Sequence, residues 1–323
     1  MQAWWSLSKE PAVSVLACPA SLKGVLTATE AAAALIAGLG PDAMALPVAD
    51  GGEGTGQVLE AVLGGRWHIA QAADPLGRTV RARWLFLPDG TAVVESAEAI
   101  GLGRLGEDEL DPLAASSAGL GELMLAALAE GPSSALGCLG GSATVDGGAG
   151  LLSVVPEWPP EVPLIVACDV RNRLLGARGA ARVFGPQKGA SPEVVEQLER
   201  RLAGIATLAP FRDLPGAGAA GGLGAALASL GGSLVEGAEL VLDRIGFDGY
   251  ARAASLVVTG EGTVDRSSLE GKATGAVLAR CRHLGVRCVL FGGRVVEGIE
   301  ARALSGDPTR AREDLRVLGL SLR

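Results

Sequence analysis

The sequence predicts a two-domain α/β protein in which one domain is formed by both ends of the chain and the other is inserted between them. The chain has 323 residues, 48% of them hydrophobic, which is enough to bury two separate cores. Only 3% of the residues are aromatic whereas 48 are glycine, so the cores must consist of Ala, Leu and Val with closely packed backbones, as in layered α/β folds. Strand and helix patterns alternate near both termini, and this recurrence predicts the discontinuous domain.

The N-terminal part of the chain is expected to begin with a β-α-β unit. Residues 12–17 form an apolar run typical of a buried strand, residues 27–39 an Ala-rich helix, and residues 43–48 a second strand. The second strand leads into an acidic, glycine-rich loop at residues 49–55, followed by a helix at residues 57–63. Open α/β sheets bind ligands at the carboxyl ends of their strands, so this loop is a candidate site.

The pattern changes in the middle of the chain. Residues 67–94 consist of short apolar segments broken by turn sequences, which predicts consecutive strands. A helix at about residues 114–129 and a strand ending near Cys138 follow. Residues 164–168 are expected to form a buried strand that delivers Asp169, and residues 192–202 a helix.

Parallel strand and helix patterns return near the C-terminus. The expected elements are, in order, a strand at residues 256–259, a glycine-rich loop at 259–265, a helix at 273–284 and a strand at 286–291. We therefore assign residues 1–75 and 246–323 to the discontinuous domain and residues 76–245 to the inserted domain.

Charge and cysteine content exclude several classes of protein. A net charge of −8 and a pI near 5.0, with no basic run, argue against nucleic acid or an anionic membrane as a partner. No segment approaches the ~20 apolar residues that span a membrane. The five cysteines are odd in number and form no CxxC pair, which is typical of a protein of the reducing cytoplasm and not of a disulfide framework or zinc ribbon.

Three of the four lysines adjoin glycine, although the chain otherwise uses arginine for positive charge. These are Lys23, Lys188 and Lys272. A compact ammonium beside a backbone that a ligand can approach closely is a common way to hold phosphate. The alternative is that these lysines lie by chance on solvated loops, which is a weaker explanation for three of them together.

Four glycine-rich segments carry carboxylates or lysine, namely residues 50–55, 140–150, 184–189 and 259–265. Backbone N–H groups in the second of these could form a phosphate cradle, which would consist of Gly140, Gly141, Ser142 and Thr144. Mg²⁺ is commonly held by one or two carboxylates together with water and phosphate oxygens. The candidate metal ligands are Asp50, Asp146, Asp169 and Asp265. The alternative is that the glycines make turns and the carboxylates cap helices.

Two familiar nucleotide-binding signatures fail on inspection. Residues 216–221 match GxGxxG, but the preceding residues 212–215 do not form the strand that a dinucleotide fingerprint needs. The Gly271-Lys272 pair resembles the end of a P-loop, but Ala273 stands where that motif requires Ser or Thr.

Taken together, these segments resemble the type I glycerate kinases, which act on D-glycerate with ATP. The matching stretches, which occur in the order typical of the family, are residues 49–55 (ADGGEGT), 140–150 (GGSATVDGGAG), 167–170 (ACDV), 184–190 (FGPQKGA), 218–224 (GAAGGLG), 259–262 (TGEG), Asp265 and 271–272 (GK). The resemblance covers nearly the whole chain.

The resemblance implies two dissimilar α/β domains, one of them flavodoxin-like, with the active site in the cleft between them. It implies transfer of the γ-phosphoryl group of ATP, with Mg²⁺, to D-glycerate at O2, with O3 as the alternative. It leaves a homodimer open. Asp50, Asp169, Lys188 and Lys272 are the expected catalytic residues. The expected substrate- or phosphate-binding residues are Lys23, Gly140, Gly141, Ser142, Thr144 and Glu261.

The sequence also departs from the family pattern. Ala20 replaces the Asp that usually precedes Ser-Phe-Lys-Gly, Ser267 replaces a Gln, and Arg173 replaces a Pro, while the stretch between Gly150 and Leu164 is short. These departures motivate one alternative, a non-catalytic sensor of glycerate or nucleotide. An NAD-dependent hydroxy-acid oxidoreductase is a second alternative, supported only by the misplaced GxGxxG.

Overall fold

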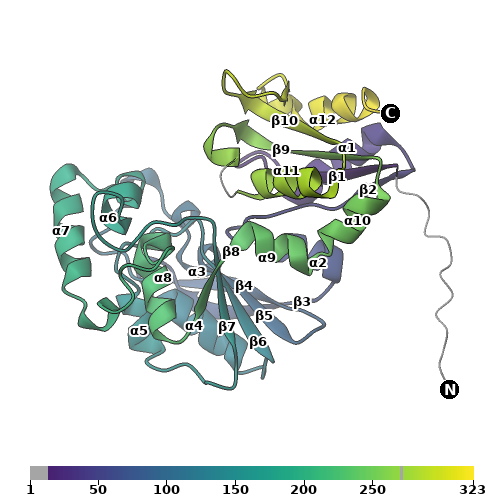
Figure 1. Ribbon diagram of the computed structural model, residues 1–323. Coiled ribbons are helices and arrows are strands. Elements are labelled where there is room, and N and C mark those ends of the chain that lie inside the picture. Colours follow the sequence, from purple (N-terminus) through teal and green to yellow (C-terminus); the bar gives the residue numbers. More distant parts are fainter. Residues whose placement is uncertain (1–13, 270–271) are drawn as a thin grey trace, which may run out of the picture. The chain divides into compact units, whose positions relative to one another are not determined.

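The computed structural model describes residues 14–269 and 272–323, and its chain divides into two compact units (Figure 1). Unit 1 comprises the chain up to Val48 together with Leu242–Arg323, and unit 2 comprises Ala49–Val241. These boundaries differ from the ones expected from the sequence, which fell after residue 75 and after residue 245. Residues 49–75 belong to unit 2, because β3 (Arg66–Ala73) pairs along its whole length with β4 (Thr79–Phe86).

Unit 1 is built on a parallel five-stranded sheet in the order β2-β1-β9-β10-β11. The strands are β1 (Val15–Pro19), β2 (Ala43–Ala45), β9 (Leu256–Val264), β10 (Cys288–Val295) and β11 (Arg302–Ala303). Counted along the chain within this unit, the order is 2-1-3-4-5, which is that of flavodoxin-like doubly wound sheets. Strand β1 from the N-terminal part thus lies between β2 and a strand from the C-terminal part.

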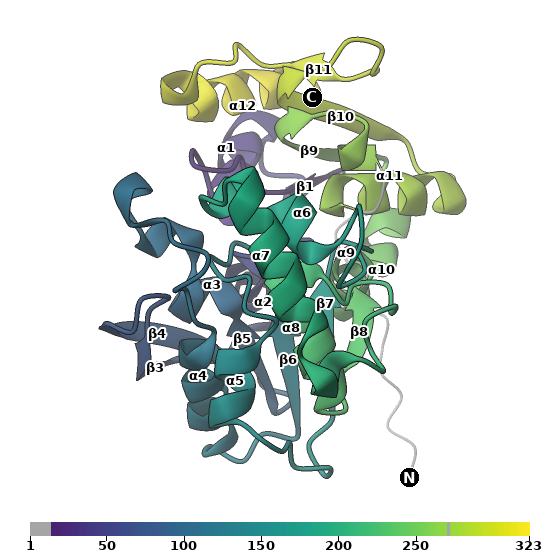
Figure 2. The same ribbon diagram turned by 90° about the vertical axis from the view of Figure 1, so that its left-hand side faces the viewer.

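Helices cover both faces of the unit 1 sheet (Figures 1 and 2). On one face, α1 (Ala28–Leu39) and α12 (Ala311–Leu320) pack on the strands. The other face carries α10 (Phe247–Ala253) and α11 (Ala273–Leu284). A Cβ atom on Gly38 of α1 would lie 2.0 Å from the carbonyl oxygen of Arg316 in α12, so only glycine allows these two helices to approach this closely.

Unit 2 contains a six-stranded sheet in the order β3-β4-β5-β6-β7-β8. Its remaining strands are β5 (Thr91–Glu95), β6 (Ser134–Cys138), β7 (Leu164–Cys168) and β8 (Ser233–Glu236). The first three strands are antiparallel, whereas β5 to β8 are parallel. The carboxyl ends of four strands therefore lie along one edge of the sheet.

Over residues 49–241, which the structure describes throughout, unit 2 contains seven helices and two hydrophobic cores, one of which includes the sheet. The helices are α2 (Thr55–Leu63), α3 (Ser96–Ile100), α4 (Ala118–Leu128), α5 (Ala149–Val154), α6 (Ala180–Phe184), α7 (Pro192–Ala203) and α8 (Ala219–Ser229). The larger core joins the sheet to α4, α5 and α8, and Figure 2 shows α4 and α5 side by side. The smaller core joins α6, α7 and α8. Helix α9 (Gly237–Arg244) directly follows β8 and contains the second boundary between the two units.

Most of the expected elements are present, and one expectation is wrong. Helix α1 begins at a capping box in which Thr27 and Glu30 bond each other's backbone N–H, and α11 has the predicted bounds. The segment 259–265, expected as a loop, instead continues β9 as far as Val264 and pairs with β10. Its glycines permit this pairing, because a Cβ on Gly260 would lie 2.2 Å from the carbonyl oxygen of Phe291. Part of the strand expected at residues 12–17 lies outside the described residues.

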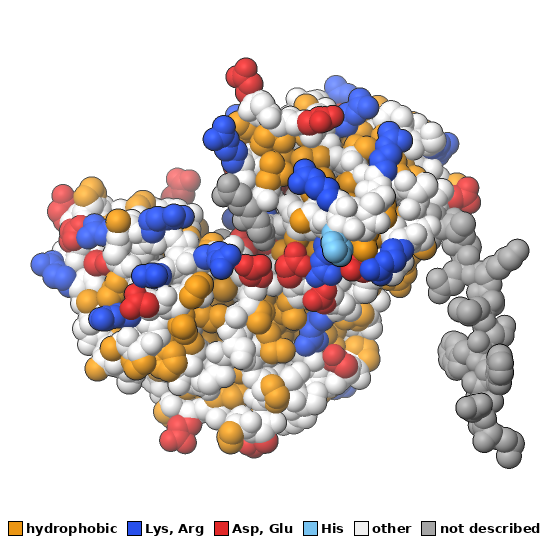
Figure 3. All heavy atoms as spheres, viewed as in Figure 1, with side chains coloured by type: hydrophobic (Ala, Val, Ile, Leu, Met, Phe, Trp, Pro, Cys, Tyr) orange, Lys and Arg blue, Asp and Glu red, His pale blue; other side chains and the backbone are white. Residues whose placement is uncertain are grey.

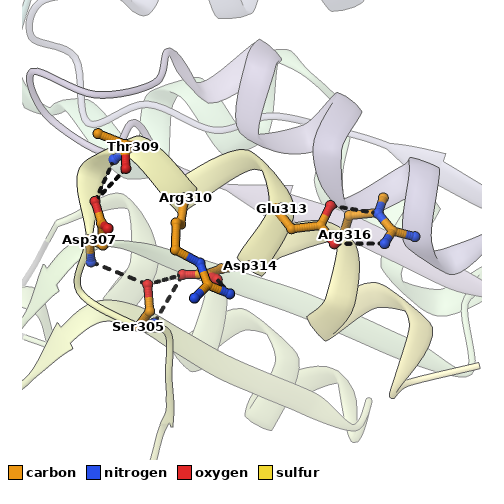
Figure 4. A network of polar contacts seen from close by, with 7 residues as sticks. All are labelled: Ser305, Asp307, Thr309, Arg310, Glu313, Asp314 and Arg316. Carbon is orange, nitrogen blue, oxygen red and sulfur yellow. Dashed lines mark hydrogen bonds and ion pairs between the residues drawn. The ribbon is translucent and has the colours of Figure 1, made fainter.

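On the visible face of the molecule, side chains of both charges lie among hydrophobic ones (Figure 3). On the face shown in Figure 3, Lys and Arg side chains are interspersed with Asp and Glu and form no single basic patch. Figure 4 shows a polar network before and along α12, in which Asp307 accepts a hydrogen bond from the Thr309 N–H at 2.9 Å and Asp314 accepts one from the Ser305 N–H at 3.0 Å. Within residues 14–269 and 272–323, no helix has the length and apolar character needed to cross a membrane.

Candidate active site

The acidic loop at residues 50–55 lies on the carboxyl edge of the unit 2 sheet. Gly51 adopts a positive φ of 85°, and a Cβ atom added to it would lie 2.8 Å from the Cβ of Ala167 in β7. A Cβ on Gly237, which follows β8, would lie 2.0 Å from the carbonyl oxygen of Asp50. Glycine at both positions therefore lets this loop sit directly on the ends of β7 and β8.

Two predicted acids, Asp50 and Asp169, lie at this edge. Asp169 directly follows β7, and the preceding Cys168 is paired in register with Glu236 of β8. Asp169 and Gly237 are thus the first residues after two neighbouring strands, β7 and β8. The Asp50 backbone packs against Gly237. Both acids are half-buried, and the Asp50 Oδ1 accepts a hydrogen bond from the Gly52 N–H at 3.1 Å.

The second glycine loop, at residues 139–144, packs against the first, backbone to backbone. A Cβ on Gly140 would lie 2.8 Å from the Cα of Gly52 and 3.1 Å from the nitrogen of Glu53. Gly141 has a positive φ of 66°, and a Cβ there would lie 2.8 Å from Oε2 of Glu53. Two of the segments that the sequence singled out separately therefore form one continuous backbone surface.

Lys188 is buried beneath the second loop. It is only 3% exposed, and its Nζ donates hydrogen bonds to Ser142 Oγ at 3.1 Å and to the carbonyl oxygen of Thr144 at 2.7 Å. Burial lowers the pKa of Lys188 from 10.5 to about 7, and the nearby carboxylate of Asp146 acts in the opposite direction. The contacts of Nζ are a hydroxyl and a carbonyl oxygen, so this lysine fixes the shape of the loop.

Two hydroxyl groups in this loop are left with hydrogen-bonding capacity. Ser142 accepts from Lys188 through its Oγ, which leaves its own proton to be donated elsewhere. Thr144 is fully buried, and its Oγ1 has no hydrogen-bond partner. A buried polar atom without a partner is costly, and it is a reason to expect a ligand or a water molecule beside it.

Asp146 has a structural role. Its carboxylate accepts four hydrogen bonds, from the Ser117 N–H at 2.9 Å and Oγ–H at 2.7 Å, from Gly148 N–H at 3.0 Å and from Gly150 N–H at 3.1 Å. These bonds tie the start of α5 to the residue before α4. Because four donors already engage the carboxylate, we leave Asp146 out of the metal ligands proposed below.

Sequence reasoning missed two residues at this edge, Glu95 and Ser96. Both are buried at the end of β5 and bond the backbone of the two glycine loops. The available signal was an acidic residue that ends the otherwise apolar run of residues 91–95. A carboxylate at the end of a buried strand is unusual enough to be noted.

Unit 1 carries the remaining predicted residues. Its strand order reverses between β1 and β9, where sheets of this type bind ligands. The loop after β1 carries the exposed Lys23 and bonds back to β9 through Ala20 N–H and the Gly260 carbonyl at 2.9 Å. A Cβ on Gly262 would lie 3.4 Å from the nitrogen of Lys23, so the Lys23 backbone runs beside the residue that follows Glu261.

Asp265 and Lys272 flank the start of α11. Asp265 Oδ1 accepts hydrogen bonds from Ser268 N–H at 3.0 Å and Oγ–H at 3.3 Å. Lys272 is the N-cap residue of α11 and makes no side-chain capping bond, while Thr274 is fully buried with its Oγ1 unpartnered. The first N–H groups of a helix attract anions. Gly271, which belongs to the predicted Gly-Lys pair, lies outside the described residues.

Over the described parts of the chain, no three Asp, Glu, His or Cys side chains converge as a metal site. Asp50 and Asp169 share one sheet edge, whereas Asp146 is engaged elsewhere and Asp265 belongs to unit 1. A pair of carboxylates is nevertheless compatible with Mg²⁺, which commonly completes its shell with water and phosphate oxygens.

Glycine loops and two acids at the carboxyl ends of parallel strands are typical of the ligand-binding edge of α/β enzymes. Comparison with known proteins identifies the family. A family profile described as Glycerate kinase family matches residues 15–157 and 154–307. The chain belongs to this family and is accordingly a kinase.

Individual relatives show how close the similarity is. The chain is 38% identical over 303 residues to the Glycerate 2-kinase of Escherichia coli (strain K12), covering 80% of each chain. It is 37% identical to the Glycerate kinase of Bacillus subtilis (strain 168), covering 88% of this chain and 85% of that one. The crystal structure of a candidate glycerate kinase 2 from Salmonella typhimurium LT2 is similar with a TM-score of 0.82 and 31% identity, covering 96% of this chain and 97% of that one.

Proposed function

We propose that the protein phosphorylates D-glycerate at O2 with MgATP, giving 2-phosphoglycerate. The proposal is carried by the edge of the unit 2 sheet, where half-buried Asp50 and Asp169 lie near two glycine loops that pack on each other, the second of them bonded by buried Lys188. Phosphoryl transfer depends on alignment and charge neutralisation more than on covalent chemistry, and this edge offers both acids and backbone donors. The similarity to the Glycerate 2-kinase of E. coli supports the acceptor and the position.

The roles that we assign to this chain's residues follow from their surroundings. One of Asp50 and Asp169 accepts the proton of the attacking hydroxyl, and the other binds Mg²⁺. Ser142 donates its free proton to an oxygen of the ligand, because Lys188 occupies its acceptor side.

The residues present fit ATP and Mg²⁺ as cofactors. Lys272, at the start of α11 beside the unpartnered Thr274 hydroxyl, is the group that we assign to a phosphate, with Lys23 and Glu261 as further ligand-binding residues. Whichever of Asp50 and Asp169 does not accept the hydroxyl proton is the proposed Mg²⁺ ligand at the unit 2 edge. When bound, Mg²⁺ supplies positive charge that offsets the charge developing on phosphate oxygens.

The experiment that tests this proposal is ³¹P NMR of the purified protein with MgATP and D-glycerate. We expect a new phosphomonoester signal coupled to a single proton, as O2 transfer requires. Coupling to two protons would instead indicate transfer to O3. Binding of ATP and glycerate without any new ester would identify a sensor and refute the kinase activity.

A further inference from the structure

Glu95 is the last residue of β5 and Ser96 is the first residue of α3, and the function proposed above uses neither of them. Glu95 is 5% exposed and Ser96 is fully buried. We propose that these two side chains are positioning residues that hold the glycine loops at residues 50–56 and 139–144 in the arrangement that phosphoryl transfer requires. The inference rests on the proposed function for its consequence, but the contacts themselves can be tested without it.

Glu95 holds the first loop. Its Oε2 accepts a hydrogen bond from Gly54 N–H at 2.9 Å, and its Oε1 accepts one from Gly56 N–H at 2.6 Å. Both donors belong to the start of α2, where the first N–H groups of a helix have no partner within the helix and where negative charge is favoured. The N-cap residue Gly54 has no side chain, so the carboxylate of a distant strand caps this helix.

Ser96 holds the second loop. Its Oγ donates to the carbonyl oxygen of Gly140 at 2.9 Å and accepts from the N–H of the same residue at 3.2 Å. Gly140 is the residue that packs on Gly52 of the first loop, with no space for a Cβ between them. One strand end thus fixes two loops that also contact each other, and the backbone of Asp50 is part of the first loop.

The charge of Glu95 determines how firmly it holds its loop. Burial raises the pKa of Glu95 to about 7, the hydrogen bonds from Gly54 and Gly56 oppose this rise, and the carboxylates of Glu98 and Glu53 add to it. Glu98 is itself paired with Arg83 at 2.6 Å. A protonated carboxyl offers fewer acceptor sites than a carboxylate, so protonation weakens at least one of the two bonds.

Glu98→Gln is a matched control for Glu95→Gln, because Glu98 lies three residues further along and bonds Arg83 but neither loop. We expect Glu95→Gln to remain folded and to lower kcat at pH 8 by about tenfold, with a smaller change in the KM for ATP. In the native protein we expect kcat to rise through pH 7, as Glu95 loses its proton and holds its loop more firmly. This rise should disappear in Glu95→Gln and persist in Glu98→Gln. Ser96→Ala, which removes both bonds to Gly140, should lower kcat while keeping the pH dependence.

A second measurement does not depend on turnover. The sequence contains three Thr-Gly pairs, at residues 55–56, 259–260 and 274–275, so labelling Thr with ¹³C at the carbonyl and Gly with ¹⁵N selects three amide signals. We expect the Gly56 signal to titrate near pH 7 in the native protein. It should not titrate in Glu95→Gln, and in Glu98→Gln it should titrate at a slightly lower pH because one repelling carboxylate is gone.

The two measurements separate the possible failures. A Gly56 amide that does not titrate, or one that still titrates in Glu95→Gln, would overturn the positioning role whatever the activity. A Glu95→Gln variant with unchanged kcat and pH profile would show that the loop position held by Glu95 does not affect catalysis. The expected titration in a protein that forms no glycerate ester would support the contact and count against the proposed function.

Discussion

Lys188 makes the stability of this protein depend on pH. Its pKa is lowered to about 7 in the folded protein, so between pH 7 and about 10.5 the unfolded chain binds more protons than the folded one. The free energy of unfolding should therefore rise with pH across this window, by up to about 5 kcal/mol. Urea denaturation at pH 7 and pH 9 measures the rise, and Lys188→Met should largely abolish it. An equal rise in both proteins would show that Lys188 is not the cause.

Lys272 is the residue whose loss should affect catalysis with the least effect on folding. It is half-buried and makes no capping bond at the start of α11, so its removal leaves the helix intact. We expect Lys272→Ala to lower kcat/KM by about a hundredfold, as for the loss of a preorganised charge at a reacting phosphate. Arg266→Ala, which removes an exposed cation of the same segment, is the control. Near-normal turnover of Lys272→Ala would remove this lysine from the mechanism.

Asp50 is open to a direct test of metal binding. If its carboxylate binds Mg²⁺, Asp50→Asn should raise the Mg²⁺ concentration needed for half-maximal activity about tenfold or more, because a charged ligand is replaced by a neutral one. Steady-state rates across an Mg²⁺ titration give this value. An unchanged titration with a reduced maximal rate would assign Asp50 to proton transfer instead.

Among single residues, Lys188, Ser142 and Thr144 all belong to the predicted glycine-rich segments, and in the structure Lys188 bonds the other two. Their roles in binding and catalysis stay predictions. The burial of Lys188 could not be foreseen, because it depends on segments that are distant in sequence. Glu95 was missed for the same reason, since its partners Gly54 and Gly56 lie about forty residues away and a carboxylate gives no local pattern.

Among the elements, the two glycine loops depend most on their exact sequence. Gly140→Ala would place a Cβ 2.8 Å from the Cα of Gly52, where neither backbone can easily move. We expect a loss of stability of about 1–3 kcal/mol and a larger proportional loss of activity. Gly249→Ala in α10 is the control, because nothing lies within 4 Å of its added Cβ, and it should stabilise the protein slightly. Thermal unfolding and turnover of both variants check this.

Elements with strong local signals were predictable. Helix α1 has its capping box and ends at Gly40, α11 ends at Gly285 in the left-handed conformation, and β7 is a short apolar run between turns. The extension of β9 to Val264 was not predictable, because Gly260 and Gly262 suggest a loop locally. Tertiary pairing with β10 overrides that preference.

For the whole molecule, the boundaries of unit 2 have a testable consequence. Residues 49–241 are continuous and contain two complete hydrophobic cores, so this segment should fold when expressed alone. We expect a cooperative thermal transition by circular dichroism for this fragment and none for residues 1–48. An unfolded 49–241 fragment would show that unit 2 depends on the remainder of the chain.

The position of β1 also determines the order in which the protein can be completed during synthesis. This strand lies between β2 and β9, and β9 is translated more than two hundred residues later. One side of β1 therefore has no pairing partner until the ribosome has made most of the chain, whereas every strand of unit 2 is already present by then. Until β9 has been made, the edge of the apolar strand β1 that β9 will cover is free to pair with other chains, so we expect this interval of synthesis to favour aggregation.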